Sequence, residues 1–276
     1  MSILAAEGKT KKIILIPKKP GMCIVVSKDD VTAGDGKRHD VIPGKGRLSN
    51  LTTCHVFELL GKNTDVPLAY SKRSSQCAFE AHYCTAIQLE VVVRFKSRGS
   101  YGKRNPDCLE GTELPSVVVE FFYKTSGRLI GKIGIACDDP LLIFENGTAR
   151  LYHPSKPGEI ILDDLTKAVD PLLVAFLQKV MPELVKLAEE VGSELRWAWQ
   201  KMNGDIDDFK IEFGIDQNGK IRLIDVIDID SIRAWYLGQE VSKEPYRNDC
   251  SVQDFFEVLV VGEAVTRRFV HLPNEV

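Results

Sequence analysis

The chain has 276 residues, a net charge of −3 at pH 7 and a pI near 6.0. Its content of 44% hydrophobic and 27% charged residues is typical of a globular protein and excludes a disordered or fibrous chain. The weak acidic balance gives no support for a nucleic-acid or membrane partner, and no segment reaches the roughly 18 consecutive apolar residues needed to cross a bilayer.

The first part of the chain predicts a twisted antiparallel sheet, because five short runs are rich in β-branched or aromatic residues. These runs are Lys12 to Ile16, Met22 to Ser27, Val66 to Ser71, Ile87 to Phe95 and Val117 to Tyr123. We expect them to form an N-terminal β-rich lobe over residues 1–124.

Two lysines precede the first of these strands. Lys9 and Lys11 are two residues apart and would share one strand face, where two cations need an anion to neutralise them. A triphosphate would serve, whereas the alternative is a pair of edge-strand lysines that discourage aggregation. A P-loop is excluded, because Ile3 stands where that motif requires glycine.

A polar, glycine-rich connection follows the second strand, over residues 32–46, and contains Asp35 and Lys37. Such a connection is either a mobile spacer or a ligand lid. The apolar spacing after it predicts a helix from about Gly46 to Leu60, with Gly61 as its stop.

Further cations stand at the ends of later strands. Arg94 ends a strand and Ser100 lies in the turn after it, so that a guanidinium fork, a hydroxyl and backbone N–H groups could bind a phosphate monoester. Lys124 ends the run that starts at Glu120. The alternative for Lys124 is a solvated strand end.

The remaining residues, 125–276, are expected to form a C-terminal α+β lobe. Glycine and proline interrupt the pattern from Thr125 to about Leu162, which predicts an irregular segment. Asp170-Pro171 then begins a long amphipathic helix that we expect to bend at Pro182. A last helix is predicted from about Val252 to Phe269.

Two strand-forming runs rich in acids lie between these helices, on either side of Asn218-Gly219. That dipeptide predicts a tight antiparallel hairpin, which could bring Glu212 near Asp225. Two carboxylates repel each other unless a cation lies between them, and a few hard oxygen ligands suit magnesium that carries phosphate. The alternative is a surface hairpin whose charges are merely solvated.

Cysteine usage favours a reducing compartment, because the seven cysteines lack paired CxxC spacing. We therefore expect a cytoplasmic protein. Cys77, His82 and Cys84 form the nearest approach to a metal-binding cluster, but no second cluster accompanies them, and zinc is not favoured.

These motifs together resemble the phosphoribosylaminoimidazole-succinocarboxamide synthases, the SAICAR synthetases of purine biosynthesis. The matching elements follow the family's order and span nearly the whole chain. They are Glu7 to Lys11, Ile24 to Lys37, Gly44 to Gly46 with Ser49-Asn50, Val91 to Arg94 with Gly99-Ser100, Glu120 to Lys124, Asp208 to Gly214, and Asp225 to Trp235.

The resemblance implies a two-lobed, ATP-grasp-like α+β fold with the nucleotide in the cleft. It further implies a ligase that uses ATP and Mg²⁺ to join carboxyaminoimidazole ribonucleotide (CAIR) to L-aspartate through an acyl phosphate of the CAIR carboxylate. The partners would be these small molecules, with no nucleic acid and no membrane, and a homo-oligomer is allowed.

Site residues follow from the same resemblance, position by position. ATP would be bound by Lys9, Lys11, Lys124, Glu212 and Asp225, of which Glu212 and Asp225 would also hold the metal. The substrates would be bound by Arg94, Ser100, Lys210, Asp230, Ser231 and Arg233. The catalytic residues would be Lys124, Lys210, Asp35 and Lys37, and Lys45 would join Asp35 and Lys37 in closing over the substrates.

Three positions depart from the family pattern. Ala6 and Ile14 stand where members commonly have tyrosine, and Val226 stands where many bacterial members have glutamate. These departures leave two alternatives open: a diverged ATP-dependent ligase that joins another amine to another carboxylate, or a non-catalytic nucleotide-binding homologue.

Overall fold

The computed structural model describes residues 3–34, 36–125 and 127–273. Its contacts divide the chain into two compact units. Unit 1 comprises Met1–Ile87, Ser193–Ile206 and Phe213–Val276, and unit 2 comprises Gln88–Gly192 and Asp207–Glu212.

The predicted boundary between residues 124 and 125 falls inside unit 2. Backbone hydrogen bonds explain the difference, because the chain on both sides of that boundary joins one sheet. The Lys124 N–H donates to the carbonyl of Gln88 at 3.1 Å, and the Tyr123 N–H donates to that of Pro140 at 2.9 Å.

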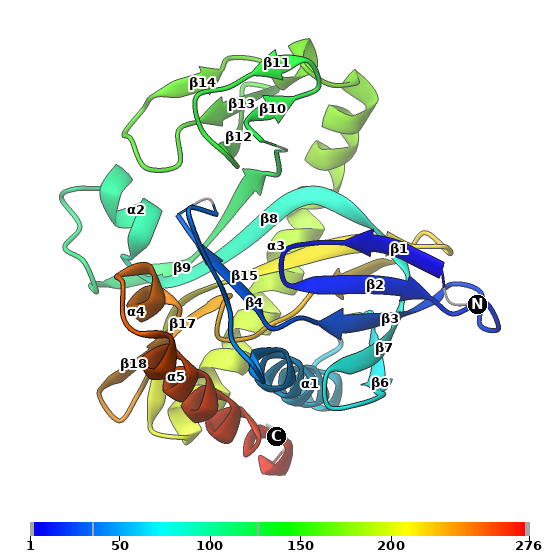
Figure 1. Ribbon diagram of the computed structural model, residues 1–276. Helices are drawn as coiled ribbons and strands as arrows, with labels where there is room; N and C mark the ends of the chain where they lie inside the picture. Colours follow the sequence, from blue (N-terminus) through cyan, green and yellow to red (C-terminus); the bar gives the residue numbers. More distant parts are fainter. Residues whose placement is uncertain (1–2, 35, 126, 274–276) are drawn as a thin grey trace. The chain divides into compact units, whose positions relative to one another are not determined.

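Unit 1 contains a five-stranded antiparallel sheet with the order β1-β2-β3-β7-β6 (Figure 1). The runs predicted at Lys12 to Ile16 and Met22 to Ser27 are confirmed as β2 and β3, but Val66 to Ser71 is mostly loop. Within that run, Leu68 forms an isolated bridge to Leu223, and Tyr70 and Ser71 begin β6. The strands are β1 (Ile3–Glu7), β2 (Lys11–Leu15), β3 (Met22–Ser27), β6 (Tyr70–Arg73) and β7 (Ala78–His82).

The polar connection after β3 is more ordered than its glycine content suggests. It contains a hairpin of β4 (Asp30–Ala33) and β5 (Arg38–Val41). The helix predicted after it is confirmed as α1 (Lys45–Asn63). A Cβ at Gly46 would lie 2.8 Å from the carbonyl oxygen of Ser27, so only glycine allows α1 to begin this close to β3.

Unit 2 is built on the strand order β14-β13-β12-β9-β8-β15. The runs predicted at Ile87 to Phe95 and Val117 to Tyr123 are confirmed within β8 and β9. The strands, apart from β15, are β8 (Cys84–Lys96), β9 (Glu113–Tyr123), β12 (Leu141–Glu145), β13 (Thr148–Tyr152) and β14 (Ile160–Leu162).

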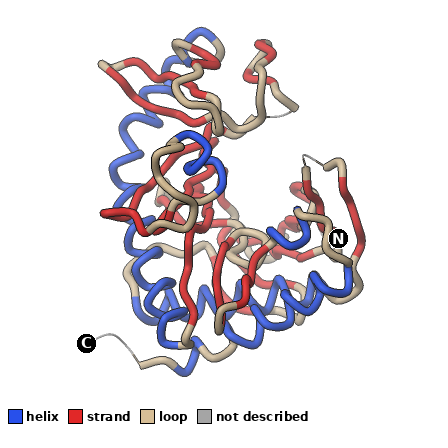
Figure 2. Tube along the Cα trace, turned by 90° about the vertical axis from the view of Figure 1, so that its left-hand side faces the viewer, coloured by secondary structure: helices blue, strands red, loops and turns tan. Residues whose placement is uncertain are grey.

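The segment predicted to be irregular therefore contains β12, β13, β14 and a minimal hairpin of β10 (Leu129–Ile130) and β11 (Ile133–Gly134). Figure 2 shows these strands joined by loops. The glycines and prolines of this segment do not prevent strands from forming; most of them lie in turns and loops and so limit the lengths of the strands. Asn146 and Gly147, for example, have positive φ in the turn between β12 and β13.

Few helices accompany these sheets. The predicted long helix is confirmed as α3, which runs through Pro182 as one element. In unit 1, α5 packs beside α1 (Figure 1). Among the described residues, no helix is long and apolar enough to span a membrane. The helices other than α1 are α2 (Gly99–Arg104), η1 (Leu165–Lys167), α3 (Pro171–Lys201), α4 (Glu244–Arg247), α5 (Val252–Thr266) and η2 (Phe269–His271).

The predicted hairpin at Asn218-Gly219 is confirmed as β15 (Gly204–Asp216) and β16 (Ile221–Ile224). The second acidic run is not one strand, because the chain leaves β16 at Asp225, whose φ is 69°. It forms a loop before β17 (Ile232–Tyr236), which pairs with β18 (Gln239–Ser242).

Candidate functional site

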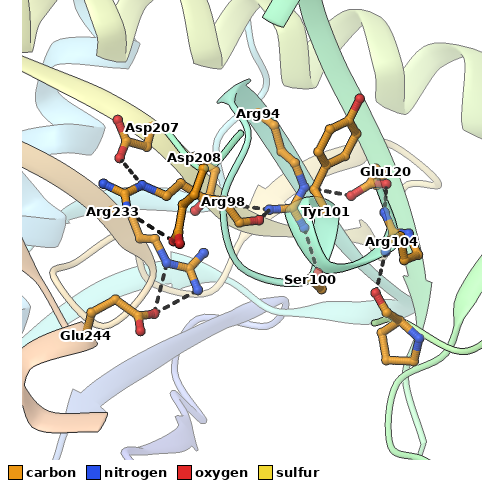
Figure 3. Close-up of polar contacts among 12 residues, drawn as sticks. Arg94, Arg98, Ser100, Tyr101, Arg104, Glu120, Asp207, Asp208, Arg233 and Glu244 are labelled. Carbon is orange, nitrogen blue, oxygen red and sulfur yellow. Dashed lines mark hydrogen bonds and ion pairs between the residues drawn. The ribbon is translucent and has the colours of Figure 1, made fainter. Parts of the chain in front are cut away.

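Acidic residues of β15 are buried in unit 2, which rules out the interpretation that they are merely solvated. Asp207 and Asp208 are 1% and 3% exposed. Asp208 accepts a hydrogen bond from Arg94 at 2.7 Å, and Asp207 accepts one from Arg98 at 2.8 Å (Figure 3). Burial of these carboxylates is stabilised by the guanidinium groups that face them.

Arg94 lies at the centre of this cluster with almost no exposure to solvent. Its Nε donates to Glu120 Oε2 at 2.6 Å, its Nη1 donates to Asp208, and its Nη2 donates to Ser100 Oγ at 3.1 Å (Figure 3). The structure thus brings together Arg94 and Ser100, the two residues expected at the ribonucleotide phosphate. All three guanidinium nitrogens have acceptors, which fixes the orientation of the group.

A second pair of predicted site residues meets elsewhere in unit 2. The Lys124 Nζ donates to Glu212 Oε1 at 2.5 Å. Lys210, two residues before Glu212 on β15, bonds Glu90 Oε2 at 2.8 Å. Residues two apart on a strand face the same side of its sheet, so one face presents both carboxylate–lysine pairs.

In unit 1, Lys11 forms an ion pair with Asp225. Lys11 is the first residue of β2, but Lys9 lies in the turn between β1 and β2 and is exposed. The prediction that both lysines share a strand face is therefore wrong. The reversal at Gly8, whose N–H donates to the carbonyl of Lys11 at 2.9 Å, takes Lys9 out of the strand.

The loop between β16 and β17 holds a buried cluster of opposite charges. The Nζ of Lys45, a side chain only 1% exposed, lies 3.0 Å from Asp230 Oδ2. Asp228 accepts a hydrogen bond from the hydroxyl of Ser49 and another from the Asp230 N–H at 3.0 Å. Ser231 closes the turn by donating from its hydroxyl to the carbonyl of Asp228 at 2.9 Å.

Burial and neighbouring charge have opposite effects on the acids of this cluster. Burial, followed by the charge of Asp230, raises the pKa of Asp228. Burial also opposes ionisation of Asp230, but Lys45 and Lys243 hold the pKa of that carboxyl below its usual value. Burial likewise opposes the charge of Lys45, yet Asp230 and Asp228 raise its pKa above that of an ordinary lysine. Asp230 and Lys45 therefore form an ionised pair at neutral pH.

The segment from Lys243 to Cys250 contacts several parts of unit 1 that bear predicted site residues. Glu244 accepts from Arg233 Nε at 2.9 Å, and Lys243 lies 3.7 Å from Asp230. Arg38, at the start of β5, donates to the carbonyls of Tyr246 and Cys250 at 2.7 and 2.8 Å. This segment thus fixes Arg233, Asp230 and the β4–β5 hairpin to one another.

The predicted lid residues can be placed only in part. Lys37 is exposed near the tip of the β4–β5 hairpin, whereas Asp35 lies outside the described residues. Lys45, expected to move with them, instead begins α1 and is buried.

Several residues of these clusters were missed by sequence reasoning. Asp228, Glu120 and Glu244 each hold a predicted site residue in place. The Asp228-Ile229-Asp230 alternation was a usable signal for Asp228, since a strand-like run does not normally contain two acids on one face. No local signal marks Glu244, because it begins α4 whereas its partner Arg233 is on β17.

Glu212 of unit 2 and Asp225 of unit 1 carry carboxylate oxygens, which hard cations such as magnesium prefer. Glu212 and Asp225 are hard oxygen ligands, and each lies against a lysine that could turn to a phosphate group. Within residues 3–34, 36–125 and 127–273, no group of three or more His, Cys, Asp or Glu side chains gathers in a way that could hold a metal ion. Magnesium in proteins is usually held by one or two carboxylates, and phosphate and water oxygens complete its coordination.

Comparison with known proteins decides the family. The model of the SAICAR synthetase family matches residues 4–128 and 162–258. The chain belongs to the SAICAR synthetase family. Every residue assigned to the site by resemblance lies within the two matched ranges, whereas most of the strand-rich segment from β10 to β14 lies outside them.

Named relatives agree with this assignment. The chain is 34% identical over 252 residues to the phosphoribosylaminoimidazole-succinocarboxamide synthase of Roseiflexus sp. (strain RS-1), covering 90% of this chain and 88% of that protein. It is 36% identical over 250 residues to the bifunctional phosphoribosylaminoimidazole carboxylase/phosphoribosylaminoimidazole succinocarboxamide synthetase of Drosophila melanogaster. That match covers 89% of this chain and 52% of the longer protein.

Solved structures of the family show the same mixed α/β fold with antiparallel sheets. A type-2 SAICAR synthetase in complex with ADP superposes with a TM-score of 0.75 at 26% identity, covering 98% of this chain and 99% of the other. A SAICAR synthetase from Pyrococcus horikoshii OT3 superposes with a TM-score of 0.70 at 25% identity, covering 96% of this chain and all of the other.

Proposed function

We propose that the protein is an ATP-dependent ligase that joins CAIR to L-aspartate to form SAICAR, with Mg²⁺ as cofactor. The observation that carries this proposal is the family match, whose two ranges contain every residue assigned to ATP, metal and substrates. The ATP-grasp-like description of the fold and the cytoplasmic location are part of the same proposal.

The reaction needs activation because a carboxylate is a poor electrophile. The γ-phosphoryl group of ATP is transferred to a carboxylate oxygen of CAIR, and ADP leaves. The amine of aspartate then attacks the carbonyl carbon of the acyl phosphate, a C–N bond forms, and inorganic phosphate leaves with loss of a proton from nitrogen. Most of the catalysis in such a transfer comes from positioning and charge neutralisation.

The nucleotide end of this reaction is assigned to the carboxylate–lysine pairs. Lys124 would turn from Glu212 toward the transferring phosphoryl group, and Lys11 would turn from Asp225 toward the ATP phosphates. The two carboxylates would then be free to hold magnesium, which would offset the charge that ATP brings. Lys9, exposed in the turn before β2, is assigned to the same phosphates.

The substrate end is assigned to the remaining groups. Arg94, Ser100 and Arg233 would hold the ribonucleotide phosphate. Lys210, Asp230 and Ser231 would contact the imidazole and aspartate. Asp35 and Lys37 would close over them.

The test is ADP release by purified protein with Mg-ATP, CAIR and L-aspartate, with each component omitted in turn and the product mass recorded. We expect turnover only with all three substrates, and the mass of the succinocarboxamide. Release that requires a different amine or carboxylate would identify a diverged ligase. Saturable ATP binding without release would identify a non-catalytic homologue.

Acidic variants test the metal assignment. Glu212→Ala and Asp225→Ala should each abolish turnover while the far-UV circular dichroism is unchanged. The matched control is Asp163→Ala, which removes a carboxylate that is 64% exposed and paired with Lys167. Normal turnover in either test variant would refute the assignment of that residue to magnesium.

A further inference from the structure

Arg104, the last residue of α2, bridges two parts of unit 2 that are distant in sequence. Its side chain is 9% exposed. Nη2 is hydrogen bonded to Glu120 Oε1, and Nη1 donates to the carbonyl oxygen of Pro154 at 2.6 Å. One guanidinium group therefore binds a β9 carboxylate and a backbone carbonyl beyond β13.

Glu120 continues this chain of contacts to Arg94. While its Oε1 accepts from Arg104, its Oε2 accepts from Arg94 Nε at 2.6 Å (Figure 3). Arg94 in turn donates to Ser100 Oγ. The ring of Tyr101 lies near both arginines, with its centroid 5.9 Å from Cζ of Arg94 and 6.0 Å from Cζ of Arg104.

The charges of this chain of contacts are balanced. Two guanidinium groups, Arg94 and Arg104, face two carboxylates, Glu120 and Asp208. Removal of Arg104 would leave Glu120 with one cation in a largely buried place. The remaining carboxylate oxygen would then compete for other nitrogens of Arg94 and change the orientation of that guanidinium.

Pro154 belongs to the segment that the family model leaves unmatched, residues 129–161. The segment is anchored to the sheet through β12, where Leu141 pairs with Phe122 of β9 and packs in a cluster with Val92. His153 shapes the turn that presents the Pro154 carbonyl, since its Nδ1 accepts from the Ser155 N–H at 3.0 Å.

We propose that Arg104 is a positioning residue through which the segment 129–161 sets the orientation of Arg94 and Ser100, and hence the affinity for the phosphate monoester of the substrate. This inference rests on the proposed function, in which Arg94 and Ser100 hold that phosphate. Lysine cannot replace Arg104, because a single ammonium group lacks the planar fork that reaches both Glu120 and Pro154.

The experiment compares Arg104→Met and Arg104→Lys in the intact enzyme. Arg104→Met should raise KM for CAIR about tenfold or more, and Arg104→Lys by a smaller factor, while KM for ATP changes by less than about twofold. Lys103→Met is the matched control, because it removes a cation from the same turn of α2 but from an exposed side chain. It should leave both KM values unchanged.

Two further measurements separate positioning from a merely structural role. Guanidinium chloride at low concentration should partly restore KM for CAIR in Arg104→Ala, and sodium chloride of equal ionic strength should not. His153→Ala should raise KM for CAIR by a few fold in the wild type but not in the Arg104→Met background, because the contact that it perturbs is already absent there.

Binding of ribose 5-phosphate, measured by calorimetry without turnover, keeps this test independent of the proposed reaction. If the wild type binds ribose 5-phosphate but does not ligate CAIR, the proposed function fails, while weaker binding by Arg104→Met still supports the role of Arg104. Unchanged CAIR KM and ribose 5-phosphate affinity in Arg104→Met would overturn the inference. An equal rise of KM for CAIR and ATP would also overturn it.

Discussion

The side chain of Asp216 accepts three hydrogen bonds that close the β15–β16 hairpin, which precedes the acidic loop. Its Oδ1 accepts from the N–H groups of Asn218 and Lys220 at 2.8 and 3.0 Å, and its Oδ2 accepts from Arg222 Nε at 2.7 Å. The hydrogen bond from Arg222, followed by that from the Lys220 N–H, lowers the pKa of Asp216 to about 2. The Asn-Gly turn is thus closed by a carboxylate that must be ionised.

The sign of the pH dependence follows from this lowered pKa. A carboxyl with a folded pKa of about 2 and an unfolded pKa of about 3.9 stabilises the fold fully above the unfolded value, and this stability is lost as pH falls toward 2. We therefore expect Asp216→Asn to lower the urea midpoint above about pH 4, with the difference from the wild type shrinking at lower pH.

Asp249→Asn is the control for this titration, since its side chain is 92% exposed. The urea midpoint of Asp249→Asn should equal that of the wild type at every pH. A difference between wild type and Asp216→Asn that stays constant from pH 6 to pH 2 would contradict the prediction.

At this scale the sequence singled out several side chains that the structure places in polar contacts, but it did not reveal their partners. Lys124 directly follows β9, as the linear pattern predicts, whereas Arg94 lies inside β8, which continues to Lys96. Glu120 and Asp208, which fix Arg94, were not assigned, because strands pair acids with bases across distances that no local pattern encodes. Lys9 was misplaced because the position of the β1–β2 turn depends on backbone hydrogen bonds at Gly8.

Among the elements, α5 is the one whose packing most directly constrains the acidic loop of unit 1. Gly262 lets the helix backbone lie directly on the side chain of Ile229, between Asp228 and Asp230. A Cβ at position 262 would lie 2.5 Å from Ile229 Cγ1, closer than packed carbon atoms allow. Ile229 is 1% exposed, and side chains in packed interiors have little room to shift.

Gly262→Ala should therefore destabilise the protein by about 1–3 kcal/mol, as overpacking of a core does. It should also displace the loop from Asp228 to Ser231 and lower turnover. Gly61→Ala is the matched control, because Gly61 is also a helical glycine but its added Cβ would lie at 3.4 Å from Leu68 Cδ1, an ordinary contact. That variant should be stabilised by about 0.5–1 kcal/mol.

Urea unfolding of both variants measures the two predicted changes in the free energy of unfolding. Equal changes in the free energy of unfolding for Gly61→Ala and Gly262→Ala would show that helix propensity, and not contact with Ile229, governs both positions.

Helices and strands were predictable from the sequence where the spacing of apolar residues and the residues that begin or end an element gave the same answer. The helix α3 and the turn between β15 and β16 were predicted correctly, because apolar spacing along a helix and an Asn-Gly turn are both patterns of residues close together in the sequence. The β4–β5 hairpin was missed, because its second strand, Arg38–Val41, is polar and is held by side-chain contacts to Tyr246 and Cys250. The strands from β10 to β14 were missed because glycine and proline were interpreted as breaks in structure when they mark the turns.

For the whole molecule, the important feature is that neither unit is a continuous stretch of chain. Unit 1 is made of three pieces, and unit 2 is made of two. The expected lobes, 1–124 and 125–276, could not reveal this, because a boundary drawn from composition assumes continuity. The pairing of β9 with both β8 and β12 decides the actual division.

A fragment of residues 1–124 should therefore fail to fold. It lacks Asp225 and Asp230, which pair with Lys11 and Lys45, and it lacks α5, which packs beside α1. A fragment of residues 88–212 contains all of unit 2 and should unfold cooperatively. Hydrogen exchange of both fragments checks this, and protected amides in β2 and β3 of the first fragment would contradict it.

The burial of Lys45 has a consequence for biosynthesis. Its partner Asp230 is translated long after it, and at roughly 5–20 residues per second the interval is on the order of ten seconds or more. Throughout that time the nascent α1 cannot bury Lys45 without a large desolvation cost. The burial of the first turn of α1 therefore has to wait until the acidic loop has been synthesised.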